Sequence, residues 1–284
     1  MLMMEFLNFI LILVEGRKNL KIKSKMGKEN DNCTIKKKKK TSIYYLIILF
    51  IFIGGFIYSG YELFKIYQKY EVAIEEYDGL KSYIKEITSE EGSDNELRME
   101  IDFQGLEDIN SDIVGWIYFE NVNVNYPIMK GIDNSYYLYH TFKKDTNSSG
   151  SIFMDYRNDS NFTNSNTIIY GHNMRNGSMF GELMKLLDEK FYNENSYFWI
   201  LTNGNKYKCE IFSLYIDEST SESYNIGFKS KEDYSNYLNM ITEKSIYNTE
   251  IIPTVDDLVI TLSTCSSAEG SSRFIVHSKL KRLE

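Results

Sequence analysis

Three short segments of this 284-residue chain bring side chains that can do chemistry to the end of an apolar run. Thr167–Tyr170 is a β-branched run that ends two residues before His172, and Val259–Ser263 ends two residues before Cys265. A third apolar run begins with Arg273. The short turn between Cys265 and Arg273 suits a hairpin, which would set the end of one strand beside the start of the next.

The three residue types suit nucleophilic catalysis on an amide. A free thiol is the most nucleophilic protein side chain near neutral pH, and a nearby cation lowers its pKa further. The imidazole of His172 can protonate a leaving amine, and the guanidinium of Arg273 can donate to an oxyanion or to substrate carbonyls. Strand alternation puts Ser263 on the same face as Cys265, where it could contact substrate.

Each of these residues also has an ordinary structural interpretation. A Cys that ends an apolar strand is usually buried, and a His after Gly usually lies in a loop, so the interpretation depends on their conjunction. We expect His140 to be a solvated or capping residue and His277 to be structural. Cys33 lies on the other side of the predicted membrane segment, and Cys209 is expected to be buried in a strand. A Cys209–Cys265 disulfide stays open.

The body of the chain has the texture of short strands separated by turn residues. We predict strands at Val114–Phe119, Val124–Met129, Ser151–Met154, Thr167–Tyr170, Phe198–Leu201, Lys206–Tyr215, Leu258–Ser263 and Arg273–Leu280. Asn203-Gly204 is a strong hairpin signal between two of them. The fold class is therefore mostly β, an antiparallel barrel with helical insertions.

Helical spacing of apolar residues predicts four helical segments. We expect a stalk over residues 62–100 with a break at Glu91–Asp94, a short helix at Leu97–Asn110, and another at Met179–Leu187. The last, at Lys231–Ile246, follows Ser230, a candidate N-cap with acidic residues in the first turn.

A membrane anchor is predicted ahead of this body. Thr41–Tyr61 is uncharged and about as long as the roughly 20 residues that a helix needs to span a bilayer. Lys36–Lys40 precedes it, so the positive-inside rule puts the N-terminus in the cytoplasm. We expect a basic tail at 1–42, an uncleaved anchor at 43–61, the stalk at 62–100 and an extracytoplasmic domain at 101–284. Residues 1–25 can be an over-extended translation start.

The charge of the chain is unevenly distributed. Residues 1–42 hold 11 basic and 4 acidic side chains, a net charge of +7. The remaining residues carry a net charge of −15, which gives the chain its total of −8. An acidic body repels phosphate, so we expect no nucleic acid partner. The few His and Cys residues make a zinc site unlikely to assemble, and we expect no metal or cofactor.

The segments YGHNM and TLSTC and the following Arg-Phe-Ile-Val closely resemble the signatures of sortases, and the order His, Cys, Arg agrees. The resemblance covers about residues 105–284 and implies a closed sortase-type barrel of antiparallel and mixed pairing. It implies that His172 is the general acid and base, Cys265 the nucleophile and Arg273 the substrate and oxyanion stabiliser. The N-terminal helices and the long inserted helix are most similar to class B sortases.

In class B, the loop before the long helix helps to form the substrate groove, so Ser219, Tyr224 and Ile226 join Ser263 as expected substrate contacts. The resemblance implies a transpeptidase that cleaves a C-terminal sorting motif after Thr through a thioacyl enzyme. The acyl group would pass to an amine of peptidoglycan or of its lipid-linked precursor. Secreted motif-bearing proteins, that amine and the bilayer are the expected partners.

Three other kinds of protein are alternatives to a wall-anchoring sortase. A pilin-polymerising sortase usually carries an Asp-Pro-aromatic lid, and the prolines here are Pro127 and Pro253 only. Papain-like or wall-hydrolysing cysteine peptidases place the Cys before the His in the chain, opposite to the order here. A non-catalytic surface-binding barrel on a stalk would not need a thiol, an imidazole and a guanidinium at three strand ends.

Overall fold

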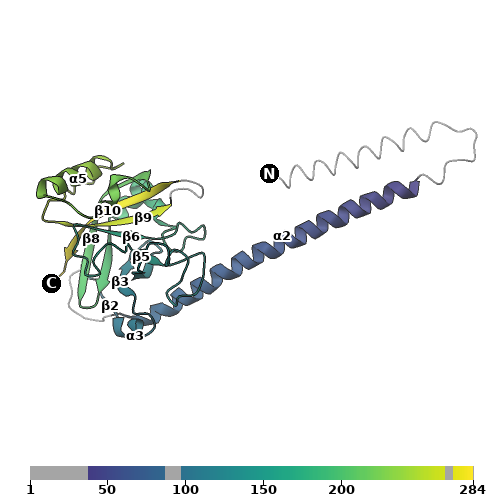
Figure 1. The fold of residues 1–284 in the computed structure, drawn as a ribbon, viewed down its shortest axis with the longest axis horizontal. Helices are drawn as coiled ribbons and strands as arrows, with labels where there is room; N and C mark the ends of the chain where they lie inside the picture. The colour runs from purple at the N-terminus through teal and green to yellow at the C-terminus, as the bar shows by residue number, and fades with distance from the viewer. Residues whose placement is uncertain (1–37, 87–96, 266–270, 284) are drawn as a thin grey trace, which may run out of the picture. The chain divides into compact units, whose positions relative to one another are not determined.

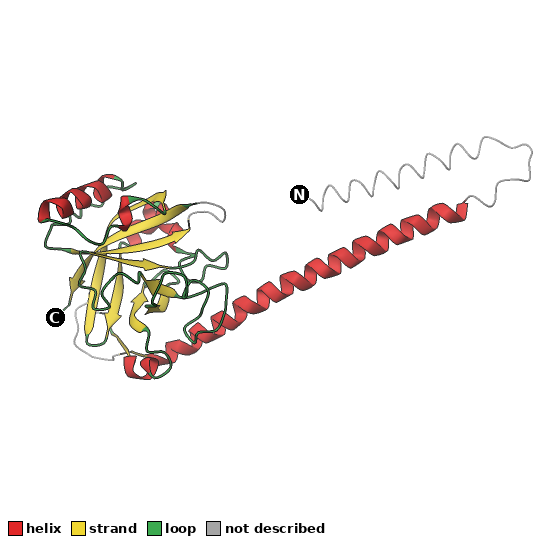
Figure 2. Cartoon of the chain, viewed as in Figure 1, coloured by secondary structure: helices red, strands yellow, loops and turns green. Residues whose placement is uncertain are grey.

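Eight strands of the described chain close into one β-barrel in the computed structural model (Figures 1 and 2). The structure describes residues 38–86, 97–265 and 271–283, with the backbone alone for 38–42 and 265. Around the barrel the strands follow the order β10-β8-β7-β3-β4-β5-β6-β9. Their bounds are β3 (Ile113–Tyr118), β4 (Asn125–Met129), β5 (Ile152–Met154), β6 (Asn166–Tyr170), β7 (Tyr197–Thr202), β8 (Asn205–Glu218), β9 (Leu258–Cys265) and β10 (Ser272–Arg282). All eight predicted strands are confirmed within a few residues, as is the hairpin at Asn203-Gly204.

Pairing around the barrel is antiparallel except in two places. β4 pairs with β5 in parallel, and β6 pairs with β9 in parallel. The carboxyl ends of parallel neighbours lie at the same edge of a sheet. The mixed, mostly antiparallel barrel expected from the sequence is therefore confirmed, and its second parallel pair joins the two segments that carry His172 and Cys265.

Strand β9 is buried on both faces, which explains its nearly continuous apolar sequence. Ile260 and Leu262 join the main core inside the barrel, and both are fully buried. Val259 packs in a second cluster on the outside of the barrel, together with residues of the long helix α5 (Lys231–Glu243). The strand thus lies between two apolar layers.

Helix α5 covers one outer face of the barrel and begins where the sequence predicts. Ser230 is its N-cap, and its hydroxyl accepts a hydrogen bond from the Asp233 backbone N–H at 3.1 Å. Its buried face consists of Tyr234, Tyr237, Leu238 and Ile241, at the spacing of an amphipathic helix.

A buried polar network lies beneath α5. The His277 ring is fully buried between the Thr261 hydroxyl at Nδ1 and the Tyr215 hydroxyl at Nε2, each at 2.8 Å. Burial lowers the pKa of His277 to about 3, so the ring is neutral. His277 therefore has the structural role that its sequence context favours.

Helix α2 (Lys38–Leu80) runs without a break from the apolar segment into the body. Within Ile43–Tyr83, an 18-residue stretch reaches a mean hydropathy of 2.1, so this helix is long and apolar enough to cross a membrane. Most of the predicted basic tail, with Cys33, lies outside the described residues.

The chain divides into two compact units, residues 1–62 and residues 63–284. Within the second unit, the Tyr77 hydroxyl donates to the Gly150 carbonyl at 2.7 Å, and the Glu76 carboxylate accepts from the Lys143 N–H at 2.8 Å.

The helix expected over residues 62–100 ends at Leu80, and among the described residues after it the prediction is wrong for the strands at 84–86 and 99–100. β1 (Ile84–Glu86) instead pairs with β2 (Met99–Ile101). Met99 and Ile101 alternate with the exposed Glu100, which is the period of a strand rather than of a helix. The predicted break at 91–94 lies outside the described residues.

Two further helices are shorter than predicted. The helix expected at 97–110 is only α3 (Phe103–Glu107), which Asp102 caps by accepting from the Gly105 N–H at 3.1 Å. The helix expected at 179–187 is a 3-10 turn at Leu183–Leu187. Met179 has φ of 55°, and a Cβ on Gly181 would lie 2.4 Å from the Met174 carbonyl, so this segment turns tightly instead. α4 (Glu189–Glu194) was not predicted.

The N-cap of α5 gives a stability prediction. Ser230→Ala leaves a helix N–H without its partner, so we expect the free energy of unfolding to fall by about 1 kcal/mol. Ser235→Ala, inside the same helix, is the matched control and should cost nothing because Ala is a better helix former. Chemical denaturation measures both variants, and equal stability of the two would contradict the capping role.

The burial of Cys209 gives a labelling prediction. This thiol is free and fully buried, and burial raises its pKa well above the usual value. We expect a water-soluble methanethiosulfonate to leave Cys209 unmodified in the native protein and to modify it once the protein is unfolded in denaturant. Peptide mass mapping reads out the sites, and native modification of Cys209 at the rate of Cys265 would disprove its inaccessibility.

Candidate active site

The parallel pair β6–β9 brings two of the predicted residues to one edge of the barrel. Tyr170 is in register with Ser263, and the backbone N–H of Gly171 donates to the Ser263 carbonyl at 3.2 Å. His172 and Cys265 each follow these positions by two residues. Their backbones therefore meet at the same edge, where the carboxyl ends of both strands point.

The antiparallel pair β9–β10 adds the third residue. Arg273 is in register with Cys265, so the two backbones are direct neighbours across the sheet. The side chain of Cys265, and Glu269 and Gly270 in the turn, lie outside the described residues. Cys209 is free, so the alternative of a disulfide between it and Cys265 is wrong.

A pocket of about 420 Å³ opens at this edge. Its described lining is Asn134, Leu138, Tyr139, Phe153, Tyr170, Gly171, His172, Ser219, Tyr224, Ser263, Thr264 and Arg273. Five residues predicted from sequence line it together: His172, Arg273, Ser263, Tyr224 and Ser219. Ile226 does not line it, because the loop turns away after Tyr224, where the Asn166 amide holds the Asn225 carbonyl at 2.9 Å.

The His172 ring is partly buried and is oriented by a backbone carbonyl. Its Nε2 lies 2.7 Å from the Leu138 oxygen. A carbonyl can only accept, so Nε2 carries a proton and, in the neutral ring, Nδ1 is the nitrogen able to take one. The ring can therefore act as a base or, when protonated, as an acid.

Arg273 brings a permanent positive charge to the pocket. It is partly buried at the start of β10, and its Nη1 donates to the Ser272 carbonyl at 3.1 Å. A guanidinium stays protonated at any physiological pH and presents several donors in a fixed plane. This suits it to stabilise negative charge on an oxygen held in the pocket.

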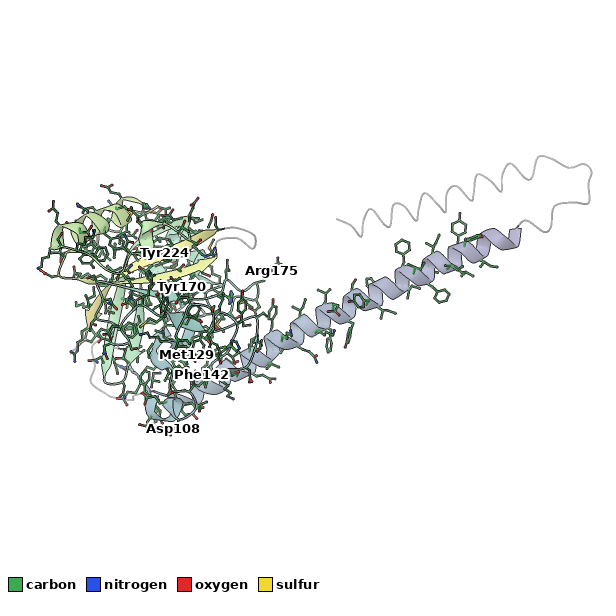
Figure 3. All side chains as sticks on the ribbon, viewed as in Figure 1. Asp108, Met129, Phe142, Tyr170, Arg175 and Tyr224 are labelled. Carbon is green, nitrogen blue, oxygen red and sulfur yellow. The ribbon has the colours of Figure 1, made fainter. Side chains whose placement is uncertain are left out.

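Tyrosines form another part of the lining. The Tyr224 hydroxyl and the Ser263 hydroxyl are 2.8 Å apart. The Tyr224 ring stacks on Tyr170, with centroids 6.3 Å apart and planes inclined by 17°. Figure 3 labels both residues among the side chains of the barrel. The loop that carries Tyr224 is thus joined to both β6 and β9.

Sequence reasoning missed the side of the pocket formed by Asn134, Leu138 and Tyr139. These residues belong to the segment 131–139, which has no helix or strand and no periodic pattern. Its one unusual feature in the sequence is the cluster of aromatic residues within a polar loop. His140 directly follows the segment and is half-buried. Its ring stacks on Tyr136, and its Nδ1 lies 2.7 Å from the Tyr136 carbonyl oxygen, which fits the capping role expected for it rather than the solvated one.

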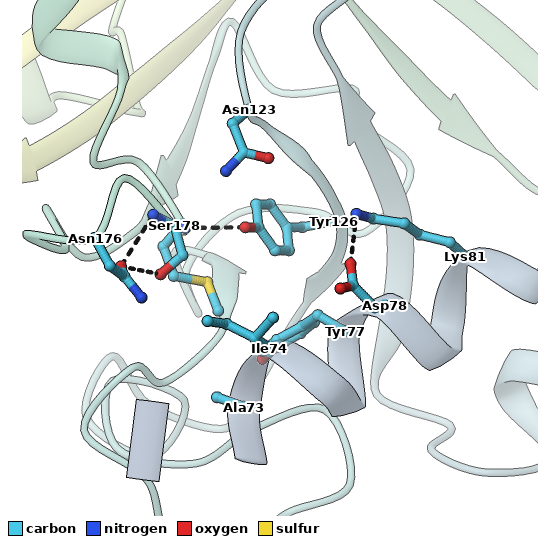
Figure 4. Close-up of a pocket in the computed structure, with 10 residues that line it drawn as sticks. Ala73, Ile74, Tyr77, Asp78, Lys81, Asn123, Tyr126, Asn176 and Ser178 are labelled. Carbon is cyan, nitrogen blue, oxygen red and sulfur yellow. Dashed lines mark hydrogen bonds and ion pairs between the residues drawn. The ribbon is translucent and has the colours of Figure 1, made fainter. Parts of the chain in front are cut away.

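A second hollow lies at the end of α2 (Figure 4). Its residues include the exposed ion pair of Lys81 and Asp78, at 2.6 Å, and Tyr126, whose hydroxyl accepts from the Met179 N–H. None of the predicted site residues lines it. Within the described part of the chain, no group of His, Cys, Asp and Glu is placed to hold a metal ion.

Comparison with known proteins agrees with this geometry. Residues 117–281 match the family model of the sortase domain. Sortase B of Listeria monocytogenes is 34% identical over 236 residues, which are 81% of this chain and 94% of that protein. Sortase B of Staphylococcus aureus is 36% identical over 180 residues, which cover 63% of this chain and 74% of that protein.

Solved structures give the same result. The crystal structure of Bacillus anthracis sortase B in complex with AAEK1 is 38% identical, with a TM-score of 0.67 over 76% of this chain and 100% of that one. A Staphylococcus aureus sortase B–substrate complex is 35% identical, with a TM-score of 0.62 over 64% of this chain and 85% of that one. The chain belongs to the sortase family of cysteine transpeptidases, within class B.

Proposed function

We propose that this enzyme is anchored in the cell membrane and joins secreted proteins to peptidoglycan. Its substrate is a protein with a C-terminal sorting motif that is cleaved after Thr. Its acceptor is an amine of peptidoglycan or of the lipid-linked precursor. The observation that carries the proposal is the strand register that sets His172, Cys265 and Arg273 at one edge, beside a single pocket.

In the first half of the cycle, the sulfur of Cys265 attacks the Thr carbonyl carbon. The negative charge that develops on the carbonyl oxygen is stabilised by the guanidinium of Arg273. His172, in its protonated form, donates a proton to the departing amine. The peptide C–N bond breaks, and a thioester between Thr and Cys265 remains.

In the second half, the acceptor amine attacks the thioester carbon and His172 takes the proton that this nitrogen loses. The C–S bond breaks, Cys265 is released, and the new amide joins the protein to the wall. The thiolate form of Cys265 is the attacking species, and the cycle returns it to this form together with protonated His172.

The N-terminal helix supports the location. An apolar helix preceded by Lys36–Lys40 favours a single pass with a cytoplasmic N-terminus and an extracellular catalytic domain. Both the secreted substrate and the lipid-linked acceptor are at the outer surface of the membrane. The similarity to class B relatives and the lack of an Asp-Pro-aromatic motif in the sequence favour wall anchoring over pilin polymerisation.

The nucleophile assignment is tested by removing the thiol. We incubate the detergent-solubilised full chain with a fluorogenic library of short peptides in which Thr precedes the cleaved bond. Cys265→Ala should lower the cleavage rate by more than about 10³-fold, because the thioester cannot form. Cys209→Ala is the matched control and should retain activity. Cleavage that survives in the Cys265 variant would reject this nucleophile.

The role of Arg273 is tested by keeping its charge and changing its shape. Arg273→Lys should lower kcat/KM by about 10²-fold, because an ammonium does not replace a planar fork of donors. Arg282→Lys, at the exposed end of the same strand, is the control and should leave kcat/KM unchanged. Near-normal kinetics of the first variant would count against the stabiliser role.

A further inference from the structure

One buried carboxylate lies next to the pocket but does not line it. Asp155 directly follows β5 and is fully buried. Its backbone N–H donates to the Ile168 carbonyl of β6 at 2.9 Å, which fixes it against the strand that leads to His172. Asp155 does not reach the pocket surface, so it cannot touch substrate.

The carboxylate is surrounded by donors. Oδ1 accepts from Nε and from the backbone N–H of Arg157, at 2.8 and 3.0 Å. Oδ2 accepts from Nη2 of Arg157 at 2.8 Å, from the Asn134 amide at 3.0 Å and from the Tyr170 hydroxyl at 3.0 Å. Burial by itself raises the pKa of Asp155, but the Arg157 pair and the other donors outweigh it and hold that pKa below its usual value. The group is therefore a buried anion with its acceptor positions filled.

The two neutral donors, Asn134 and Tyr170, both line the pocket, and they come from different elements. Asn134 lies in the segment 131–139 and its own oxygen accepts from the Tyr156 N–H at 3.0 Å. The same segment carries Leu138, whose carbonyl orients His172. One carboxylate thus holds the segment that forms one side of the pocket.

Tyr170 extends the same restraint to the part of the lining that contains Tyr224 and Ser263. Its ring stacks on Tyr224, which is bonded to the Ser263 hydroxyl. With its hydroxyl held by Asp155, the Tyr170 ring has a fixed plane on which Tyr224 rests. Arg157 alone is sufficient to neutralise the carboxylate. A purely structural ion pair would not need the additional hydrogen bonds that Asp155 accepts from the two pocket residues.

We propose that Asp155 is a positioning residue for substrate binding, which sets Asn134 and Tyr170 so that the pocket they line fits the sorting-motif peptide. This inference rests on the proposed function, since it concerns the same pocket. Asp155 acts through these two side chains and makes no contact with the reacting atoms.

The test is a kinetic comparison of Asp155→Asn with wild type, using full-length enzyme and the best-cleaved peptide of the fluorogenic library. An amide at residue 155 presents a donor where donors already point and leaves Arg157 without its anion. We expect KM to rise about 10-fold and kcat to change by less than about 3-fold, because the pocket loses its fit while Cys265 is unaltered.

Asp257→Asn is the matched control. Asp257 accepts from Lys279 at 2.9 Å and from the Thr254 N–H at 2.8 Å, and it does not line the pocket. Its loss should lower the melting temperature but leave KM unchanged. If Asp155→Asn has the KM of wild type, or if Asp257→Asn raises KM as much, the positioning role is overturned.

Tyr170→Phe covers the case in which Asp155→Asn does not fold. It removes one hydroxyl and keeps the ring and its stacking. We expect a several-fold higher KM at an unchanged melting temperature, and an unchanged KM would overturn the inference. Where both single variants fold, the double variant should have nearly the KM of Asp155→Asn, since both changes remove the hydrogen bond between Tyr170 and Asp155. Effects of the two changes on KM that multiply would contradict a shared role.

The same experiment separates this inference from the function on which it rests. A wild-type enzyme that cleaves no peptide of the library would refute the proposed function and the inference with it. A wild type that cleaves, alongside an Asp155→Asn variant with equal KM, would refute the positioning role alone.

Discussion

The parallel pairing of β6 with β9 is the constraint on which the rest of the site depends. In a barrel whose other pairs are antiparallel apart from β4–β5, this pair sends the ends of two buried strands to one edge. A shift of one residue in its register would turn the side chains of one strand to the opposite face. The continuous burial of β9 between two apolar clusters specifies that register strongly, because any slip would expose part of one cluster.

The strands fix the backbone of the site, but buried polar groups fix its side chains. Beneath α5, the Asn166 amide donates to the Asn225 carbonyl and lies 3.4 Å from the Ser223 carbonyl, the residues on either side of Tyr224. On the other side of the pocket, Asp155 holds Asn134 and Tyr170. Polar groups are costly to bury without hydrogen-bond partners. When all of their hydrogen bonds are made, they favour one arrangement of the surrounding side chains over others. The segments that carry Asn134 and Tyr224 are therefore held in a defined conformation although neither belongs to a strand or an α-helix.

The strands, and the meeting of the backbones of His172, Cys265 and Arg273 at one end of the barrel, could be predicted from the sequence because each of these residues adjoins an end of a buried apolar run. The helix predicted at 62–100 was wrong at 84–86 and 99–100, because short apolar alternation, as in Met99 to Ile101, is ambiguous within a longer helical pattern. The pocket side formed by Asn134 and Leu138 could not be predicted, because it is placed by contacts to residues far along the chain. Ile226 does not line the pocket for a related reason, since the bond between the Asn225 carbonyl and the Asn166 amide decides where its loop turns.

The central claim is that the thiol of Cys265 shares one pocket with the imidazole of His172. The most direct test is the NMR spectrum of the three histidine rings before and after Cys265 is converted to its S-methylthio form. The account predicts that the resonances of His172 shift, while those of the half-buried His140 and the buried His277 stay in place. Unmoved His172 resonances, or equal shifts of all three rings, would contradict it.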